Sequence, residues 1–260
     1  MNNMYDQNYA DYYDYFSVGL PGEKDFYVEL AKNTRGEILE LGCGTGRILI
    51  DIAKEGINIT GLDISPEMLE KAWKKVKKLT QEMQKNIELI QGSMENFSLG
   101  KKFDLIIIPY RAFLHLLTSQ QQKSALERIY NHLRPEGKLV LNFFDPCLET
   151  IASHLDKEEP SMEKITDFVL PSGNNVDVLC HRVYYPGDQI LVEDRVFEES
   201  DSMGEVVKKG KSVLKLRWIY RFEMEYLLEL CGFSIENLYG DFHKNPYRYA
   251  GEQIWTAKKL

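Results

Sequence analysis

Three glycines at alternate positions, Gly42, Gly44 and Gly46, follow a short apolar run in the segment ILELGCGTGRI, residues 38–48. Glycine has no side chain, so a loop with three glycines lets a ligand approach the main chain closely. A plain strand-to-helix turn would need only one left-handed glycine. The spacing therefore favours a ligand-binding loop over a purely structural turn.

Two phosphate-binding motifs have related glycine patterns, but neither matches this loop. The dinucleotide fingerprint needs glycines at its first, third and sixth positions, and the sixth position counted from Gly42 is Arg47. A P-loop ends in Gly-Lys-Ser or Gly-Lys-Thr, whereas Arg47 and Ile48 follow Gly46. The loop is therefore predicted to contact a ligand without binding a pyrophosphate.

Two carboxylates accompany the loop. Glu40 precedes it and favours a cationic or amino-bearing ligand. Asp63 ends the next predicted strand, where a carboxylate can accept hydrogen bonds from two ribose hydroxyls. The alternative role of Asp63 is entry to the following helix, but Ser65 and Pro66 already provide that start. A nucleoside with a positive, amine-bearing tail suits both carboxylates, and S-adenosylmethionine is such a molecule.

The segments around these residues alternate between strand and helix signals, which is typical of a parallel sheet with helices on its faces. Strands are predicted at residues 37–41, 58–62, 87–91, 103–108 and 138–144. The run 103–108 is apolar almost throughout, as expected for a central strand covered on both faces. In such sheets ligands bind beyond the carboxyl ends of the strands, which is where the glycine loop and Asp63 are expected.

A period of two replaces this pattern in residues 168–219 and predicts an antiparallel insertion. A helix at 223–231 should end at Gly232, and strands near 233–239 and 252–257 are predicted to pair antiparallel at the sheet edge. The predicted parts are an N-terminal helical cap or lid (1–34), a cofactor-binding core (35–145), the insertion (146–219), and a C-terminal helix with edge strands (220–260).

Composition limits the possible functions. A net charge of -8 counts against a large nucleic-acid surface, because such surfaces depend on clustered Lys and Arg. The N-terminal residues have neither a basic region nor an apolar one, and no apolar run is long enough to span a membrane. The cysteines show no paired spacing and read as reduced thiols, so a cytoplasmic protein without metal is expected. They are Cys43, Cys147, Cys180 and Cys231.

The stretches ILELGCGTGRI, GLDIS and HLRPEGKLVLNFFDP together resemble the class I S-adenosylmethionine-dependent methyltransferases, in element order from about Tyr13 to the C-terminus. The resemblance implies an α/β enzyme with a Rossmann-like, doubly wound, mainly parallel seven-stranded sheet and an antiparallel β insertion after the fifth strand. It also implies that S-adenosylmethionine is the cofactor.

The same resemblance implies particular cofactor contacts. Glu40 would support the methionine amino group, the three glycines would pass under the cofactor, and Asp63 would bind the ribose. Many members have a Gly-Asp pair after the third strand, whereas this sequence has Gly92-Ser93, so a hydroxyl or a water replaces the acid at the adenine. The implied cofactor-binding residues are Glu40, Gly42, Cys43, Gly44, Gly46, Asp63, Ile64, Ser93, Met94 and Pro109.

The acceptor loop is expected at residues 109–116, which resemble the corresponding loop of small-molecule members, including amino-sugar N-methyltransferases. Several of these carry a histidine at the place of His115. His115 could take a proton from the acceptor, or it could simply pack under the loop. Tyr110 would line the substrate site. Arg111 would bind an anionic acceptor, or it would form a surface ion pair.

Outside the core, the N-terminal ADYYD resembles an opening in which the tyrosine closes over the cofactor, and Tyr13 is the match. Tyr13 is therefore a candidate catalytic or lid residue, with aromatic packing as its alternative. The insertion could cover the acceptor site, or its exposed edge could form a homodimer.

The leading hypothesis is an enzyme that methylates nitrogen or oxygen of a small molecule. One alternative is a non-catalytic S-adenosylmethionine-binding protein. The other is an RNA or protein methyltransferase, for which a charged stretch in the insertion is the local support. It consists of Lys208, Lys209, Lys211, Lys215 and Arg217.

Overall fold

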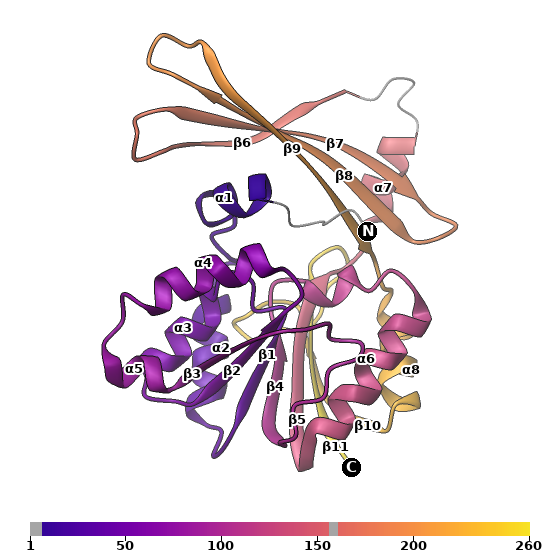
Figure 1. Cartoon of the computed structure of the whole chain (residues 1–260). Coiled ribbons are helices and arrows are strands. Elements are labelled where there is room, and N and C mark those ends of the chain that lie inside the picture. The colour runs from indigo at the N-terminus through magenta and orange to yellow at the C-terminus, as the bar shows by residue number, and fades with distance from the viewer. Residues whose placement is uncertain (1–6, 156–160) are drawn as a thin grey trace. The chain divides into compact units, whose positions relative to one another are not determined.

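The computed structural model describes residues 7–155 and 161–260 (Figure 1). Contacts divide the chain into two compact units. The larger unit contains Gly19–Pro146 and Trp218–Leu260. The smaller unit contains Cys147–Arg217 together with an N-terminal segment that ends at Val18. The predicted cap at 1–34 is therefore divided between the two units.

The larger unit is an α/β sheet structure. Its strands are β1 (Ile38–Leu41), β2 (Ile59–Asp63), β3 (Ile87–Gln91), β4 (Phe103–Ile108), β5 (Leu133–Phe144), β10 (Phe233–Tyr239) and β11 (Glu252–Lys259). Its helices are α2 (Glu23–Lys32), α3 (Arg47–Lys54), α4 (Pro66–Val76), α5 (Gln81–Lys85), η1 (Ala112–His115), α6 (Ser119–His132) and α8 (Arg221–Leu230). Figure 1 shows α2, α3 and α4 on one side of the sheet and α6 and α8 on the other.

The described strands of this unit form one seven-stranded sheet in the order β10-β11-β5-β4-β1-β2-β3. Pairing among β1 to β5 is parallel, while β11 is antiparallel to both β5 and β10. The doubly wound fold and the antiparallel edge are thereby confirmed. β4 is the middle strand, as its unbroken apolar run predicted.

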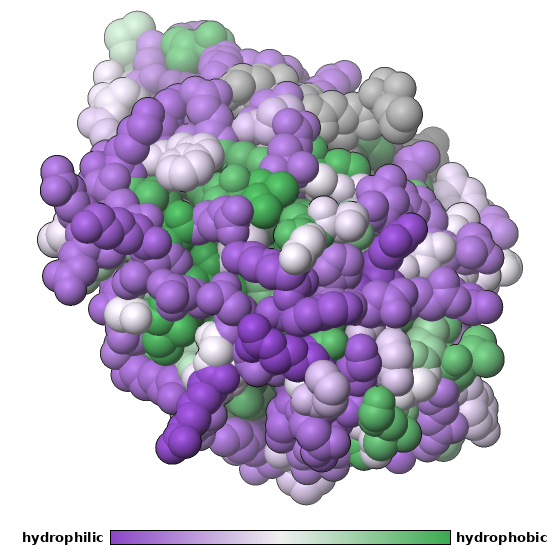
Figure 2. Space-filling model, turned by 60° about the horizontal axis from the view of Figure 1, so that its bottom comes forward, coloured by the Kyte–Doolittle hydropathy of each residue, from purple (hydrophilic) through white to green (hydrophobic). Residues whose placement is uncertain are grey.

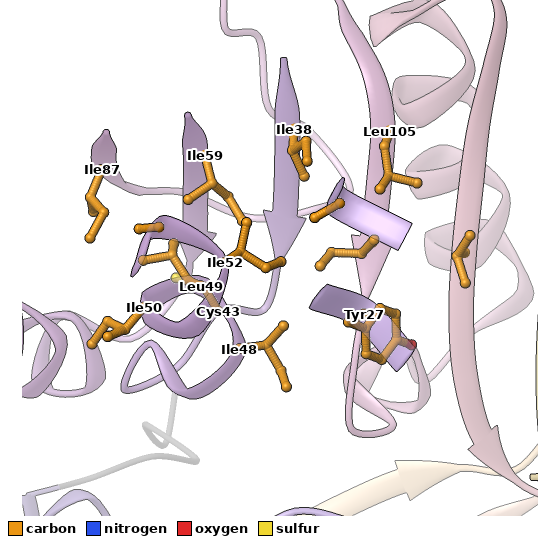
Figure 3. Close-up of a cluster of buried hydrophobic side chains, with 14 of the residues drawn as sticks. Tyr27, Ile38, Cys43, Ile48, Leu49, Ile50, Ile52, Ile59, Ile87 and Leu105 are labelled. Carbon is orange, nitrogen blue, oxygen red and sulfur yellow. The ribbon is translucent and has the colours of Figure 1, made fainter. Parts of the chain in front are cut away.

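A buried apolar layer holds α2 and α3 against the sheet. Figure 3 shows Ile38, Ile59 and Leu105 on neighbouring strands facing Leu49 and Ile52 of α3. Ile38, Leu49 and Ile52 have no exposed surface. Burying each such side chain stabilises the fold by roughly 1.5–3 kcal/mol. This layer fixes α3, and with it the loop that leads from β1 into α3.

Two local expectations can be compared directly with the structure. Ser65 caps α4, because its hydroxyl accepts a hydrogen bond from the main-chain nitrogen of Met68, and Pro66 is the first helical residue. β5, however, begins at Leu133 and not at residue 138. The ladder with β4 shifts register between Phe103 and Leu105, so that Leu133 pairs before an irregular Pro-containing stretch. Sequence patterning missed this start because proline cannot donate to a ladder.

The smaller unit is an antiparallel sheet with two helices. It contains β6 (Glu163–Val169), β7 (Asn175–Tyr185), β8 (Ile190–Ser200) and β9 (Val206–Arg217), in that order across the sheet, with α1 (Gln7–Phe16) and α7 (Leu148–Leu155). The predicted insertion is confirmed, although β6 starts before the predicted residue 168. β9 lies at an edge of the sheet. Dimerisation through that edge stays a prediction.

Aromatic packing places α1 in the smaller unit. Tyr9 and Tyr12 are buried against Val176, Val178 and Phe197. The ring of Tyr12 stacks on that of Phe197, with centroids 5.2 Å apart. This apolar contact gives the physical reason why the N-terminal helix belongs with the insertion.

The described helices include none with the length and hydropathy of a membrane span. Hydrophilic side chains dominate the face shown in Figure 2, with smaller hydrophobic groups between them.

Candidate functional site

The glycine loop lies at the carboxyl ends of β1 and β2. The main-chain nitrogens of Gly42 and Cys43 both donate to the carbonyl oxygen of Leu62, at 2.8 and 3.1 Å. Gly42 has a φ of 71°, and a β-carbon there would lie 2.7 Å from the β-carbon of Ala112 in η1. A side chain at position 42 would therefore meet both backbone strain and a collision. Gly44 and Gly46 are also left-handed, so all three glycines have a conformational reason to be present.

Asp63 connects this loop to the start of α4. Its Oδ2 accepts a hydrogen bond from the nitrogen of Gly44 at 2.7 Å, and its Oδ1 accepts from the nitrogen of Ser65 at 2.9 Å. Burial raises the pKa of Asp63 above its ordinary value, and these amide hydrogen bonds oppose the rise. Each carboxylate oxygen can accept a second hydrogen bond, so the side chain is oriented and can still bind hydroxyl groups.

S-adenosylhomocysteine is the product that remains when S-adenosylmethionine, the expected cofactor, has given up its methyl group. We expect Asp63→Asn to weaken binding of this product about tenfold, which corresponds to roughly 1.4 kcal/mol. Asparagine has the same shape but would turn an amide N–H toward either Gly44 or Ser65, and it removes the charge offered to the hydroxyls. Isothermal titration calorimetry measures the effect. Asp51→Asn is the matched control and should bind as the wild type does, because Asp51 is a half-buried residue of α3 that pairs with Lys54. An unchanged affinity in Asp63→Asn would remove Asp63 from the site.

Glu40 is a buried carboxylate with an unsatisfied oxygen. The residue is 3% exposed, and its Oε2 has no hydrogen-bond partner among the residues that the structure describes. Burial raises the pKa of Glu40 to about 8, with Arg47 opposing the rise and Glu23 and Asp63 adding to it. A buried, unpartnered carboxylate oxygen calls for a donor from a ligand, and an ammonium group meets that need.

A second buried carboxylate lies nearby and was not predicted. Glu23, at the start of α2, has no exposed surface, and its Oε2 lies 2.7 Å from Nη2 of Arg47. The Arg47 guanidinium also stands over the ring of Tyr110, 4.8 Å from its centroid. Arg47 directly follows the glycine motif, which was the available signal. Glu23 gave none, because an acidic residue in the first turn of a helix is usually solvated.

The acceptor loop follows β4. Tyr110 and Arg111 both have positive φ, at 51° and 67°. Arg111 forms an ion pair with Glu252 and stands over the ring of Phe144, at 5.3 Å from its centroid. The guanidinium therefore already has protein partners, as the ion-pair interpretation expected. His115 is the last residue of η1 and is half-buried.

The remaining predicted residues fall into two groups. Ile64 is 62% exposed directly after β2, and Met94 lies after β3, with its terminal carbon 3.6 Å from where a Gly42 β-carbon would be. Ser93 precedes Met94, and Pro109 opens the acceptor loop, so these residues all follow carboxyl ends of strands. Tyr13 lies in α1 of the smaller unit, and its role toward a cofactor stays a prediction.

The described residues support neither a metal site nor a nucleophilic cysteine at the glycine loop. The described residues contain no cluster of His, Cys, Asp or Glu that could hold a metal ion. Cys43 is buried in the glycine loop, and burial raises the pKa of its thiol well above the ordinary value. The thiol is therefore protonated and contributes packing, not nucleophilic chemistry.

Fold and site together define a class of protein. An open, mainly parallel sheet carries a glycine loop beside buried carboxylates at the carboxyl edge of its strands. That arrangement suits a nucleoside cofactor with a cationic tail. Glu40 offers an unsatisfied acceptor, and only glycine at position 42 lets the loop pass beside Ala112 without a collision.

Comparison with known proteins agrees with this class. The family profile described as a methyltransferase domain matches residues 38–137. YqeM of Bacillus subtilis (strain 168), named as a methyltransferase, is 31% identical over 237 residues, which cover 91% of this chain and 89% of YqeM. The chain belongs to the class I S-adenosylmethionine-dependent methyltransferases, and S-adenosylmethionine is its cofactor.

Two further similarities concern particular members. The dTDP-3-amino-3,4,6-trideoxy-alpha-D-glucopyranose N,N-dimethyltransferase of Streptomyces venezuelae is 30% identical over 145 residues, covering 53% of this chain and 58% of that enzyme. The CcbJ methyltransferase from Streptomyces caelestis has a similar structure, with a TM-score of 0.79 at 18% identity, covering 99% of this chain and 98% of CcbJ. The second similarity concerns the fold alone.

Proposed function

We propose that this methyltransferase acts on nitrogen or oxygen of a small molecule, with an amino group on a nucleotide-linked sugar as the leading acceptor. The observation that carries the methyl-donor part is the unpartnered buried oxygen of Glu40 beside the left-handed glycine loop. The acceptor class is supported by the similarity to the amino-sugar dimethyltransferase.

The chain's own residues would have defined tasks. The cofactor supplies a methyl group on a positively charged sulfur. Glu40 would bind its ammonium group, Asp63 would accept its ribose hydroxyls, and the main chain at Gly42 would let it lie close. Tyr110 and the loop around it would hold the acceptor, since transfer needs mainly alignment at near-contact distance and exclusion of water. His115 would accept the proton that the acceptor amine loses.

The smaller unit contains a cavity of its own. This cavity has a volume of about 310 Å³, and its lining includes His154, Cys180, Arg182 and Tyr184. Arg182 donates through Nε to Glu193 at 2.7 Å, so its charge is partly neutralised. A mixed polar and apolar cavity of this size suits a small molecule better than a macromolecule.

Two of the five cations behind the macromolecular alternative already have partners. Lys209 of β9 pairs with Glu198 at 2.5 Å, and Arg217 donates to Gln189 at 3.0 Å. These two side chains are engaged within the smaller unit, which reduces the charge available to a phosphate backbone. A nucleic-acid groove needs cations available to phosphates.

Methyl transfer can be tested with a labelled cofactor. We expect the protein to transfer label to dTDP-3-amino-3,4,6-trideoxy-alpha-D-glucopyranose and not to the matched sugar with a hydroxyl in place of the amine. The amine has the more nucleophilic lone pair. Total RNA and unfolded protein serve as alternative acceptors, and mass spectrometry of the product identifies the methylated atom. Label on RNA or protein, with none on either sugar, would overturn the small-molecule assignment.

A further inference from the structure

The turn after β4 contains two consecutive left-handed residues that are not glycines, Tyr110 and Arg111. Residues with a β-carbon rarely adopt this conformation, and it persists only where the surroundings hold it. The turn leads into η1, whose Ala112 lies next to Gly42. The conformation at Tyr110 and Arg111 therefore sets the position of the acceptor loop against the glycine loop.

One buried residue binds the main chain of both residues of this turn. Asn142 of β5 has no exposed surface, and its Oδ1 accepts a hydrogen bond from the nitrogen of Tyr110 at 3.0 Å. Its main-chain oxygen accepts from the nitrogen of Arg111 at 3.1 Å. The same Oδ1 also accepts from the hydroxyl of Tyr27 at 2.9 Å. Asn142 thus links the turn to α2 as well as to β5.

Glu252 of β11 completes the arrangement. Its Oε2 accepts from Nδ2 of Asn142 at 3.1 Å, and its Oε1 accepts from Nε of Arg111 at 3.1 Å. Donation to Glu252 fixes which way the Asn142 amide faces, so that Oδ1 must point to Tyr110. A carboxylate and an amide together therefore hold both ends of the strained turn.

A purely structural explanation does not account for these side chains. β5 and β11 already pair through their main chains, with Ile254 opposite Asn142 and Glu252 opposite Phe144. The hydrogen bond between the two side chains adds one link to strands that this ladder already holds together. Their other side-chain hydrogen bonds run to the turn and to Tyr27.

We infer that Asn142 and Glu252 are positioning residues for methyl transfer, which hold the Tyr110–Arg111 turn left-handed and so place the acceptor loop beside the glycine loop. The catalytic consequence rests on the proposed function, whereas the effect on the turn does not.

The positioning role of Asn142 and Glu252 can be tested by exchanging the donor and the acceptor of the hydrogen bond between their side chains. Asn142→Asp sets a carboxylate against Glu252, and Glu252→Gln sets an amide N–H against Asn142. The double variant restores one donor and one acceptor, in the opposite direction and with the wild-type net charge. Asn237→Asp is the control for the added charge, because Asn237 is an exposed residue of β10 whose Nδ2 donates to the hydroxyl of Thr256 at 3.1 Å.

Amide hydrogen exchange across residues 109–116, at constant pH, reports the turn directly. We expect either single variant to raise exchange there about tenfold or more, and the double variant to return it to within about threefold of wild type. With an acceptor that is turned over, kcat should fall about tenfold in the singles and recover in the double. Asn237→Asp should change neither quantity.

Several outcomes would overturn the inference. If amide exchange in the double variant is as fast as in the single variants, the Asn142–Glu252 pair does not hold the turn. The same conclusion follows if exchange in the single variants equals that of the wild type. Faster exchange with unchanged kcat and KM would reduce the pair to a structural role. If a single variant fails to fold, Tyr27→Phe removes one bond to Asn142 and should raise exchange about threefold. Absence of any acceptor would count against the proposed function alone, because exchange needs none.

Discussion

Gly42→Ala is expected to weaken binding of S-adenosylhomocysteine by at least about a hundredfold and to abolish methyl transfer. The φ of 71° costs a non-glycine residue roughly 1 kcal/mol, and the new β-carbon would lie 2.7 Å from that of Ala112. Either the glycine loop or η1 must move, and both lie where the cofactor and the acceptor should meet. Calorimetry gives the affinity, and thermal unfolding should show a loss of about 2–4 kcal/mol.

Gly56→Ala separates the cost of the backbone from the cost of the collision. Gly56 has a φ of 77°, but nothing lies within 4 Å of the β-carbon it would gain. This control should lose about 1 kcal/mol of stability and keep its affinity for the cofactor product. If Gly42→Ala behaves like Gly56→Ala, the glycine loop does not contact the cofactor.

The parts of the site that depend on a single strand-to-loop connection could be predicted from neighbouring residues in the sequence. The glycine loop and Asp63 lie within one segment of 22 residues, from Gly42 to Asp63. The loop follows β1, and Asp63 ends the neighbouring parallel strand β2. Parallel strands bring such segments to one edge of the sheet, so their meeting follows from topology. The start of α4 was equally local, because Ser65 and Pro66 act within one helical turn.

The network around Asn142 could not be predicted in this way. Its partner Tyr27 is 115 residues away in the sequence, and Glu252 is 110 residues away. Asn142 lies in a run of apolar residues that marks a buried strand and reveals nothing about its partners. Only pairing of β5 with β4 and β11 brings these groups together. Glu23 was missed because its burial depends on its contact with Arg47 of α3, whereas an acidic residue in the first turn of a helix is usually solvated.

The sequence pattern also could not predict that the two N-terminal helices belong to different units. Helix signals cover both α1 and α2, yet α1 packs in the smaller unit and α2 in the larger one. Which sheet a short amphipathic helix covers depends on matching apolar surfaces. Here Tyr9 and Tyr12 match Phe197 of β8. Periodicity reports that a helix has an apolar face but not what that face contacts.

Glu40→Gln is expected to weaken binding of S-adenosylhomocysteine about 30- to 100-fold, or roughly 2–3 kcal/mol, because an amide cannot replace a carboxylate facing an ammonium group. In the wild type, Glu40 has a pKa of about 8 and is largely protonated at pH 7. Binding must then release that proton, so wild-type affinity should rise between pH 5.5 and 7.5, by up to about tenfold per pH unit. The variant should show no such rise.

The same pKa predicts an opposite trend for stability without cofactor. The folded state keeps the proton on Glu40 up to about pH 8, whereas the unfolded chain loses it near the ordinary value. Glu40 therefore stabilises the fold most at low pH, and its contribution falls as pH rises toward 8. Denaturant unfolding of Glu40→Gln should lose this slope, while Glu55→Gln, in a surface pair with Lys32, should keep it. Equal pH slopes of both affinity and stability in Glu40→Gln and wild type would show that another group binds the ammonium.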